Sequence, residues 1–158
     1  MHAELSIVPA TTEDAAEVLV LQRCCWVTEA IANATLDIPA LHEELDDVLA
    51  WIPTAWIVRE GGRLIGGVRA TLDDGAWHIG RLMVAPDRRG EGIGGGLLRH
   101  AETAAPEGAD RFALFTGARS LRNLGMYERA GYRRVAADDV LVHLEKARAG
   151  SSIAPPVD

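Results

Sequence analysis

Apolar positions recur along the chain with two different periods, and these predict an order of strands and helices. Short apolar runs rich in β-branched and aromatic residues predict strands at residues 5–8, 55–59, 64–72, 77–84, 112–116, 132–136 and 140–144. Apolar residues at helical spacing predict helices at residues 11–32, 40–51, 93–105 and 121–130.

The boundaries of these elements carry recognisable signals. Gly61-Gly62 and Asp73-Asp74-Gly75 lie between successive strands and are typical of hairpin turns. Thr11 with Asp14 resembles a capping box at the start of the first helix. Ser120 is expected to cap the last helix.

The resulting order, β-α-α-β-β-β-α-β-α-β-β, predicts an α+β fold. Grouped hairpins and one β-α-β crossover give a mixed central sheet flanked by helices. A chain of 158 residues is long enough for one domain. We place that domain at residues 1–146 and expect residues 147–158, which are small, polar and proline-containing, to form a flexible tail.

Residues 79–98 combine an apolar strand, a glycine-rich turn and the start of a helix. The strand stops at Pro86, the turn contains Arg88 and Arg89 with several glycines, and the helix begins near Ile93. Glycines leave main-chain N–H groups bare, and a helix start adds unpaired donors at the positive end of its dipole. This arrangement predicts a cradle for a phosphate or pyrophosphate.

Gly90, Gly92 and Gly95 in this turn also fit the dinucleotide fingerprint G-x-G-x-x-G. That motif requires a series of parallel β-α units with an acidic residue after the next strand. Here the strands before the turn have an antiparallel pattern, and Asp110 precedes the next strand. The sequence contains no G-x-x-x-x-G-K-[ST] loop either. The sequence therefore excludes both a dinucleotide-binding domain and a nucleoside-triphosphate-binding loop.

Two segments instead resemble the GNAT family of N-acetyltransferases. In the run LMVAPDRRGEGIG, Arg89, Gly92 and Gly94 occupy the fixed positions of the family's R/Q-x-x-G-x-G/A signature. The later run Asn123 to Tyr132 is similar to the family's N-x-x-x-Y-x-x-x-G-F/Y segment. The order of predicted elements from about residue 5 to 145 is also that of the GNAT fold, with a mostly antiparallel sheet.

The resemblance implies an enzyme that moves an acetyl group from acetyl-CoA to a primary amine of a small molecule or peptide. It also implies a place for each part of the cofactor. The main chain of Leu82, Met83 and Val84 would pair with the pantetheine arm, as an added strand does. An N–H near Val84 would face the thioester oxygen. The implied pyrophosphate ligands are Arg89, Gly90, Gly92, Ile93, Gly94 and Gly95.

The same resemblance places Tyr127 near the CoA sulfur, where its hydroxyl would protonate the departing thiolate. Asn123 lies four residues earlier and therefore shares its helix face. The alternative for Tyr127 is a buried core tyrosine with one hydrogen bond. We expect the catalytic role, because Asn123 and the glycine motif accompany it.

The general base is harder to place. Many relatives have a glutamate on the strand before the glycine turn, but here that strand contains His78 and Arg81 and no carboxylate. Glu29, at the end of the first helix, is our candidate base, acting through a water. His78 is an alternative candidate, since histidine is in general a common acid–base catalyst, although a histidine on a strand is more often simply solvated. Arg81 is expected to pair with an acid of the second helix rather than with an anionic acceptor.

The four tryptophans have less specific roles. Trp51 and Trp56 are expected in the core. Trp26 lies one turn before Glu29 and either packs in the core, which we favour, or forms a wall with Glu29 around a cation.

Charge and cysteine content narrow the function classes. Residues 1–80 hold 13 acids against four arginines, whereas residues 81–158 hold ten acids against 12 basic residues, and the net charge is −7. The total argues against a nucleic-acid partner. The asymmetry fits an anionic cofactor beside the C-terminal half and a cationic acceptor beside the N-terminal half, unless these charges are only solvated surface.

Cys24 and Cys25 are adjacent and are the only cysteines, so we expect no disulfide and a reducing, cytoplasmic location. No spacing of ligands predicts a metal site, and no apolar stretch predicts a membrane span or secretory signal. Oligomeric state stays open, a homodimer included. The alternative function is a non-catalytic acyl-CoA-binding sensor or partner module. The absence of a carboxylate from the strand before the glycine-rich turn favours this alternative.

Overall fold

A computed structural model describes residues 4–150 of the chain. Within these residues the sheet has seven strands in the order β1-β2-β3-β4-β5-β7-β6, and β4 with β5 is its parallel pair. The strands are β1 (Ile7–Pro9), β2 (Ala55–Glu60), β3 (Arg63–Asp73), β4 (Ala76–Val84), β5 (Arg111–Gly117), β6 (Arg133–Ala137) and β7 (Leu141–Ala147). The mixed, mostly antiparallel α+β fold expected from the sequence is confirmed.

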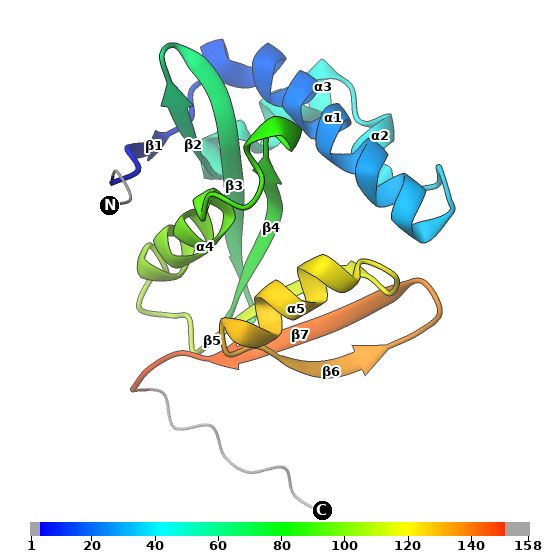
Figure 1. The fold of residues 1–158 in the computed structure, drawn as a ribbon. Helices are drawn as coiled ribbons and strands as arrows, with labels where there is room; N and C mark the ends of the chain where they lie inside the picture. Colours follow the sequence, from blue (N-terminus) through cyan, green and yellow to red (C-terminus); the bar gives the residue numbers. More distant parts are fainter. Residues whose placement is uncertain (1–3, 151–158) are drawn as a thin grey trace, which may run out of the picture.

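Helices cover both faces of this sheet (Figure 1). They are α1 (Ala15–Asn33), α2 (Pro39–His42), α3 (Leu45–Trp51), α4 (Ile93–Thr103) and α5 (Leu121–Arg129), with 3-10 turns at η1 (Thr12–Asp14), η2 (Ile52–Thr54) and η3 (Pro86–Arg88). The predicted capping box before α1 is present, since the Thr11 N–H donates to Asp14 over 2.8 Å. The order of elements matches the sequence prediction, apart from a break in the second helix.

Alternation along β3 separates the two faces. A Cβ atom at Gly66 would lie 2.9 Å from the Leu97 side chain, so this residue faces α4. Arg69, three residues on, points to the other face and stacks on Trp51 of α3. Consecutive β3 residues from Leu64 to Val68 are buried, as expected for a central strand covered on both sides.

The core contains one large apolar cluster that joins the helices to the sheet. Trp77 is buried in it and donates its indole N–H to the Ala101 carbonyl of α4 over 2.8 Å. Trp51 and Trp56 are partly buried against this cluster, in agreement with the sequence prediction, and Trp26 packs there too. The fully buried side chains include Val18, Val48, Ile52, Val58, Ile65, Val68, Met83, Leu97, Leu98 and Leu144.

The prediction of one helix over residues 40–51 was wrong. The chain leaves helical geometry at Glu43, whose ψ angle is 141°, and α3 restarts after Glu44. A reciprocal hydrogen bond from the Glu44 N–H to Asp47 starts this second helix. The apolar pattern continues across the break, so it gave no sign of it. Glu43 instead turns inward and accepts hydrogen bonds from Gln22 and Arg81.

The structure differs from two further sequence expectations, the Ser120 cap of α5 and the start of the C-terminal tail. Ser120 makes no side-chain cap to α5, because its hydroxyl donates to Glu29 of α1. Residue Ala147 still belongs to β7, and Arg148 donates to the carbonyls of Ala105 and Ala109, so the ordered chain extends past residue 146. Residues 151–158 of the expected tail lie outside the described residues.

The parallel strands β4 and β5 part early. Their pairing covers Ala76–His78 of β4, and beyond it the two strands diverge (Figure 1). At the same point the register between β3 and β4 shifts, with Arg69 opposite Gly80 and Gly67 opposite Met83. The extra residue in β4 is a β-bulge, and Arg81 in it has a φ of +46°. The bulge bends β4 away from β5 and opens the sheet.

Candidate functional site

The N-terminus of α4 is an uncapped helix start. Gly92 precedes the helix with a φ of +84°, and it has no side chain to cap the first turn. The first helical hydrogen bond runs from the Gly96 N–H to the Gly92 carbonyl over 3.0 Å. The N–H groups of Ile93, Gly94 and Gly95 therefore have no partner inside the helix and form a cluster of donors.

The two arginines of this turn differ. Arg88 bridges Glu60 and Glu91, at 3.0 and 2.7 Å, and thus ties the turn to β2. Arg89 is half-buried and makes no ion pair or hydrogen bond within residues 4–150. Within the described residues, Arg89 is consequently the arginine of this turn without a partner, and it stays our predicted ligand of the pyrophosphate.

The free edge of β4 leads directly to this helix. The Ala85 N–H donates to the Ile65 carbonyl over 2.8 Å, which makes these two residues a hydrogen-bonded pair. Because such pairs alternate in an antiparallel ladder, the main-chain groups of Val84 and Leu82 face away from β3, toward the opening. Met83 pairs with Gly67 and faces β3. The main-chain contact of Leu82, Met83 and Val84 to pantetheine stays a prediction, and this register favours Val84 over Met83.

This edge, α4 and α5 meet at Gly94. A Cβ atom there would lie 3.5 Å from Val84 Cγ2 and 3.6 Å from the Met126 sulfur of α5. From the opposite side, the Cys25 thiol of α1 donates to the Val84 carbonyl over 3.2 Å. Burial raises the pKa of Cys25 to about 11, so this thiol is protonated at neutral pH.

Tyr127 follows Met126 on α5 and lies in the core. It is 7% exposed, and its ring packs edge-on against Tyr132 with the ring centres 6.0 Å apart. The burial of Tyr127 agrees with the core-tyrosine alternative, but its hydroxyl makes no hydrogen bond within the described residues 4–150. Burial, helped by the Glu29 charge, raises the pKa of Tyr127 above its ordinary value, so the phenol stays protonated.

Glu29 and Asn123 lie together where the end of α1 meets the start of α5. The Asn123 amide donates to Glu29 Oε1 over 3.1 Å, and the Ser120 hydroxyl donates to Glu29 Oε2. Asn33 of α1 adds a hydrogen bond to Ser120 Oγ at 2.9 Å. A Cβ atom at Gly117 would lie 2.5 Å from the Asn33 amide, so glycine is required for this approach. The contact joins the β4 and β5 halves of the molecule.

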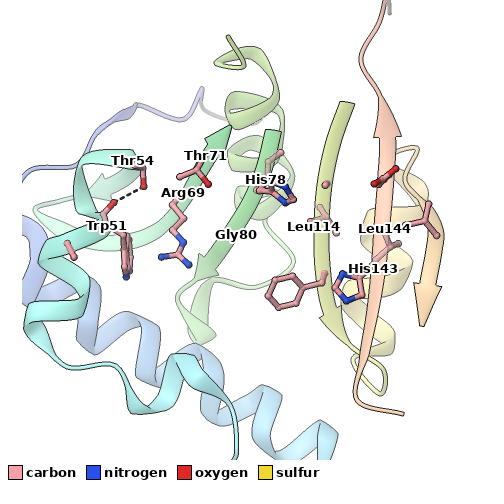
Figure 2. A pocket seen from close by; sticks show the side chains of 15 residues that line it. Trp51, Thr54, Arg69, Thr71, His78, Gly80, Leu114, His143 and Leu144 are labelled. Atoms are coloured by element: carbon pink, nitrogen blue, oxygen red, sulfur yellow. Dashed lines mark hydrogen bonds between the residues drawn. The ribbon is translucent and has the colours of Figure 1, made fainter. Parts of the chain in front are cut away.

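A cavity of about 480 Å³ lies on the other face of the sheet, beside the point where β4 and β5 part. Figure 2 shows Arg69, Thr71 and His78 on one side and His143 on the other. Apolar side chains complete the walls. They include Trp51, Ile79, Leu114, Phe115 and Val135. Because its lining includes residues of both parted strands, this cavity reaches the opening from the face opposite α4 and α5.

Arg81 forms the ion pair expected from the sequence. Its Nη2 lies 2.8 Å from Glu43 Oε1, with the two side chains 13% and 17% exposed. The guanidinium also lies 5.7 Å from the centre of the Trp26 ring. The cation beside Trp26 is therefore Arg81 itself, and Glu29, the other half of the suggested wall, is engaged with α5.

Comparison with known proteins identifies the fold and its family. A model of the acetyltransferase (GNAT) family matches residues 17–132. The chain belongs to the GNAT family of acetyltransferases. The matched span contains the α4 turn and Tyr127.

Solved GNAT structures share the fold at low identity. The PaiA N-acetyltransferase of Thermoplasma acidophilum, in complex with coenzyme A, has a TM-score of 0.80 and 16% identity, over 92% of this chain and 99% of that one. YncA of Salmonella typhimurium, a putative acetyltransferase with acetyl-CoA, has a TM-score of 0.73 and 15% identity, over 99% and 100%. A search of curated protein sequences finds no match.

A third GNAT neighbour is part of a larger protein. N-acetylglutamate synthase of Neisseria gonorrhoeae, complexed with coenzyme A and N-acetyl-glutamate, has a TM-score of 0.72 and 17% identity, over 94% of this chain and 36% of that one.

Residues 4–150 contain no helix long and apolar enough to cross a membrane. Within the same range, no group of three or more histidine, cysteine or acidic side chains is arranged to hold a metal ion. Sequence analysis missed Arg69 and His143 of the cavity. Their positions depend on the register of strands distant in sequence, and no local motif marks them.

Proposed function

We propose that this GNAT protein transfers an acetyl group from acetyl-CoA directly to the primary amine of a small molecule or peptide. The observation that carries this proposal is the uncapped start of α4 at the end of β4, whose free edge faces the opening of the sheet. A phosphate-bearing arm with amide groups fits this combination of unpaired N–H donors and unpaired strand edge.

The residues at this edge divide the binding of acetyl-CoA among them. Ile93, Gly94 and Gly95 would donate their main-chain N–H groups to the pyrophosphate, and Arg89 would add a mobile positive charge. Leu82 and Val84 would hydrogen-bond the pantetheine amides along the strand. When bound, acetyl-CoA supplies an activated thioester, whose carbonyl oxygen gains negative charge during the reaction. The Val84 N–H is our candidate for stabilising that charge.

Tyr127 is our candidate general acid. In direct transfer the amine nitrogen bonds to the acetyl carbon, the carbon–sulfur bond breaks, and the sulfur leaves as a thiolate. A protonated phenol without a protein partner is suited to give that thiolate its proton. Asn123, one turn earlier, is held by Glu29 and would fix the orientation of this helix face.

The amine must lose a proton before or during attack, and Glu29 remains our candidate base, through a water. Its two oxygens already accept hydrogen bonds from Ser120 and Asn123. A carboxylate has about four lone-pair positions, so these two bonds leave room for a water. An acetyl-cysteine route is disfavoured, because the Cys25 thiol is buried and protonated.

The test is release of free thiol from acetyl-CoA by the purified protein, measured with a panel of primary amines. Amine-dependent release, with formation of the N-acetyl product confirmed by mass spectrometry, would support the proposal. Tight acetyl-CoA binding without release for any amine would favour the non-catalytic binding module. A protein that neither binds acetyl-CoA nor releases thiol contradicts both.

A further inference from the structure

Two half-buried arginines in residues 4–150 make neither an ion pair nor a hydrogen bond. They are Arg89 at the α4 turn and Arg69 in the cavity on the opposite face of the sheet. Other arginines that are not fully exposed have partners. Arg59, Arg81, Arg88 and Arg111 face carboxylates at 2.7 to 2.9 Å. A half-buried guanidinium without an anion has lost part of its hydration and has no charged partner in exchange. These are the properties of an arginine whose charged partner is a bound ligand.

The surroundings of Arg69 hold its guanidinium in place. It lies 5.0 Å from the centre of the Trp51 ring, and this stacking fixes one face of the planar group. On the other side, Gly80 of β4 has no side chain, and a Cβ atom there would lie 3.8 Å from Arg69 Nε. Arg69 thus reaches over β4 at the level where β4 and β5 part (Figure 2).

Nearby acids do not neutralise this charge. Glu43 pairs with Arg81, and Glu145 on the far wall lies 3.6 Å from Arg111. Burial lowers the pKa of Arg69, and the Arg81 charge lowers it further, although Glu43 opposes this. An arginine stays charged at neutral pH even so. The cavity consequently presents one uncompensated cation among largely apolar walls.

We propose that this cavity is the acceptor site and that Arg69 binds the carboxylate of the acceptor, which makes the substrate a small aminocarboxylic acid. The inference rests on the proposed function for the transfer itself. The guanidinium fork matches a carboxylate with two parallel hydrogen bonds. A cavity of about 480 Å³ lies in the range of small-molecule sites, roughly 300–1,000 Å³. The acceptor's amine then points into the opening, toward the thioester.

The distribution of charge along the sequence had suggested a cationic acceptor. In the structure, many acids of the N-terminal half are bound to arginines. Examples are Asp14 and Glu17 with Arg59, Glu43 with Arg81, and Glu44 with Arg23. The remaining acids of residues 1–80 do not line the cavity, whereas Arg69 lines it and makes no ion pair within residues 4–150.

The experiment compares α-, β- and γ-amino acids with their primary amides, which keep the amine and remove the carboxylate. An α-amino amide carries the less basic amine, so amine protonation alone favours the amide over the acid. We expect kcat/KM to be higher for the acids, by roughly 10- to 100-fold, the value of one charged bidentate contact. Equal values for acids and amides would overturn the proposal.

Variants of Arg69 test whether this residue causes the preference for acids over amides. Arg69→Met keeps the apolar contact with Trp51 and should raise KM for the acids by roughly 10- to 100-fold, leaving the amides unchanged. Arg69→Lys keeps the charge without the guanidinium fork, so its KM for the acids should lie between those of the wild type and Arg69→Met. The control is Arg134→Gln on β6, an exposed arginine paired with Glu128 outside the cavity. An equal loss for acids and amides in Arg69→Met would overturn the proposal.

A binding measurement separates this proposal from the proposed function. N-acetyl amino acids and their N-acetyl amides are titrated into the CoA-loaded protein by calorimetry, which requires no turnover. Binding of the acids alone, abolished in Arg69→Met, supports the carboxylate site even if acetyl transfer fails. Equal binding of the amides, or no binding of any acid, overturns it even if other amines are acetylated.

Discussion

The Glu43 carboxylate lies 2.8 Å from the Arg81 guanidinium and joins the break between α2 and α3 to the bulge in β4. Arg81 has a φ of +46°, which is unfavourable for a residue with a side chain. Gln22 and Trp51 also donate to this carboxylate, at 2.6 and 3.3 Å. The pair therefore holds the bulge that separates β4 from β5, and the site depends on that separation.

Replacing Glu43 by glutamine should destabilise the protein by about 2–3 kcal/mol. Loss of one partner from a fully buried pair costs about 3–5 kcal/mol, and this pair keeps some contact with solvent. Thermal and urea unfolding measure the change. The adjacent Glu44→Gln is the matched control, because its pair with Arg23 is exposed and worth about 0–1 kcal/mol. Equal losses in the two variants would contradict this role of Glu43.

The same pair predicts how stability depends on pH. Burial raises the pKa of Glu43, but hydrogen bonds from Arg81 and Gln22 outweigh it, and the net pKa is lowered. A carboxyl group with a lowered pKa stabilises the fold above its unfolded pKa, and this contribution is lost as pH falls through the folded value. The difference in Tm between wild type and Glu43→Gln should therefore shrink below about pH 4.5. A constant difference down to pH 3 would argue against it.

Gly92→Asp should abolish acetyl-CoA binding while the protein still folds. Its φ of +84° makes any side chain unfavourable, and the carboxylate would repel the phosphates at the start of α4. Gly62→Asp is the matched control, since its φ is +79° in the β2–β3 turn and a Cβ atom at either glycine meets nothing within 4 Å. Both variants should lose about 1–2 kcal/mol of stability. Calorimetry should find normal acetyl-CoA affinity for Gly62→Asp alone.

Tyr127→Phe should keep acetyl-CoA affinity and lower kcat by ~10²-fold or more, the usual effect of removing a general acid. Tyr132→Phe is the control, because that hydroxyl donates to Glu102 and touches no part of the proposed site. Equal falls in kcat and kcat/KM would indicate a transition-state effect. Near-normal turnover in Tyr127→Phe would show that Tyr127 is not the general acid, and a water would then be the proton donor.

Glu29→Gln tests the base. If Glu29 accepts the amine proton, kcat should fall by ~10²-fold in Glu29→Gln, with acetyl-CoA affinity unchanged. Glutamine keeps one oxygen that can accept from Asn123, and its amide N–H groups can donate to Ser120 Oγ, so the contact between α1 and α5 should persist. A near-normal kcat with weaker acetyl-CoA binding would instead show that Glu29 only positions Asn123.

The sequence predicted the turn before α4 because it belongs to a short contiguous motif with a local physical cause, and the resemblance to the GNAT family marked Tyr127 as a candidate. Gly92 needs a positive φ, and Tyr127 lies one turn after Asn123. The break at Glu43 was not predictable, because the partners that turn its side chain inward, Gln22 and Arg81, are 21 and 38 residues away. Local propensity contains no information about such partners.

Arg69 was missed for the same reason. Its position over Gly80 depends on the shifted register of β3 and β4, and its lack of an acid depends on where Glu43 and Glu145 find partners. Ser120 shows the opposite error, since a good capping residue was predicted to cap α5 and instead binds Glu29, 91 residues away. Sequence motifs led to the proposed acetyl-CoA site, whereas tertiary contacts form the cavity that we propose for the acceptor.

The most direct test of the account is calorimetric titration of acetyl-CoA into the purified protein, with NAD and ATP as controls. We predict one site per chain for acetyl-CoA and none for the controls. At about 100 times the dissociation constant, acetyl-CoA should raise the free energy of unfolding by about 2.7 kcal/mol. No heat of binding and an unchanged Tm at millimolar acetyl-CoA would contradict the proposed site at α4 and the free edge of β4.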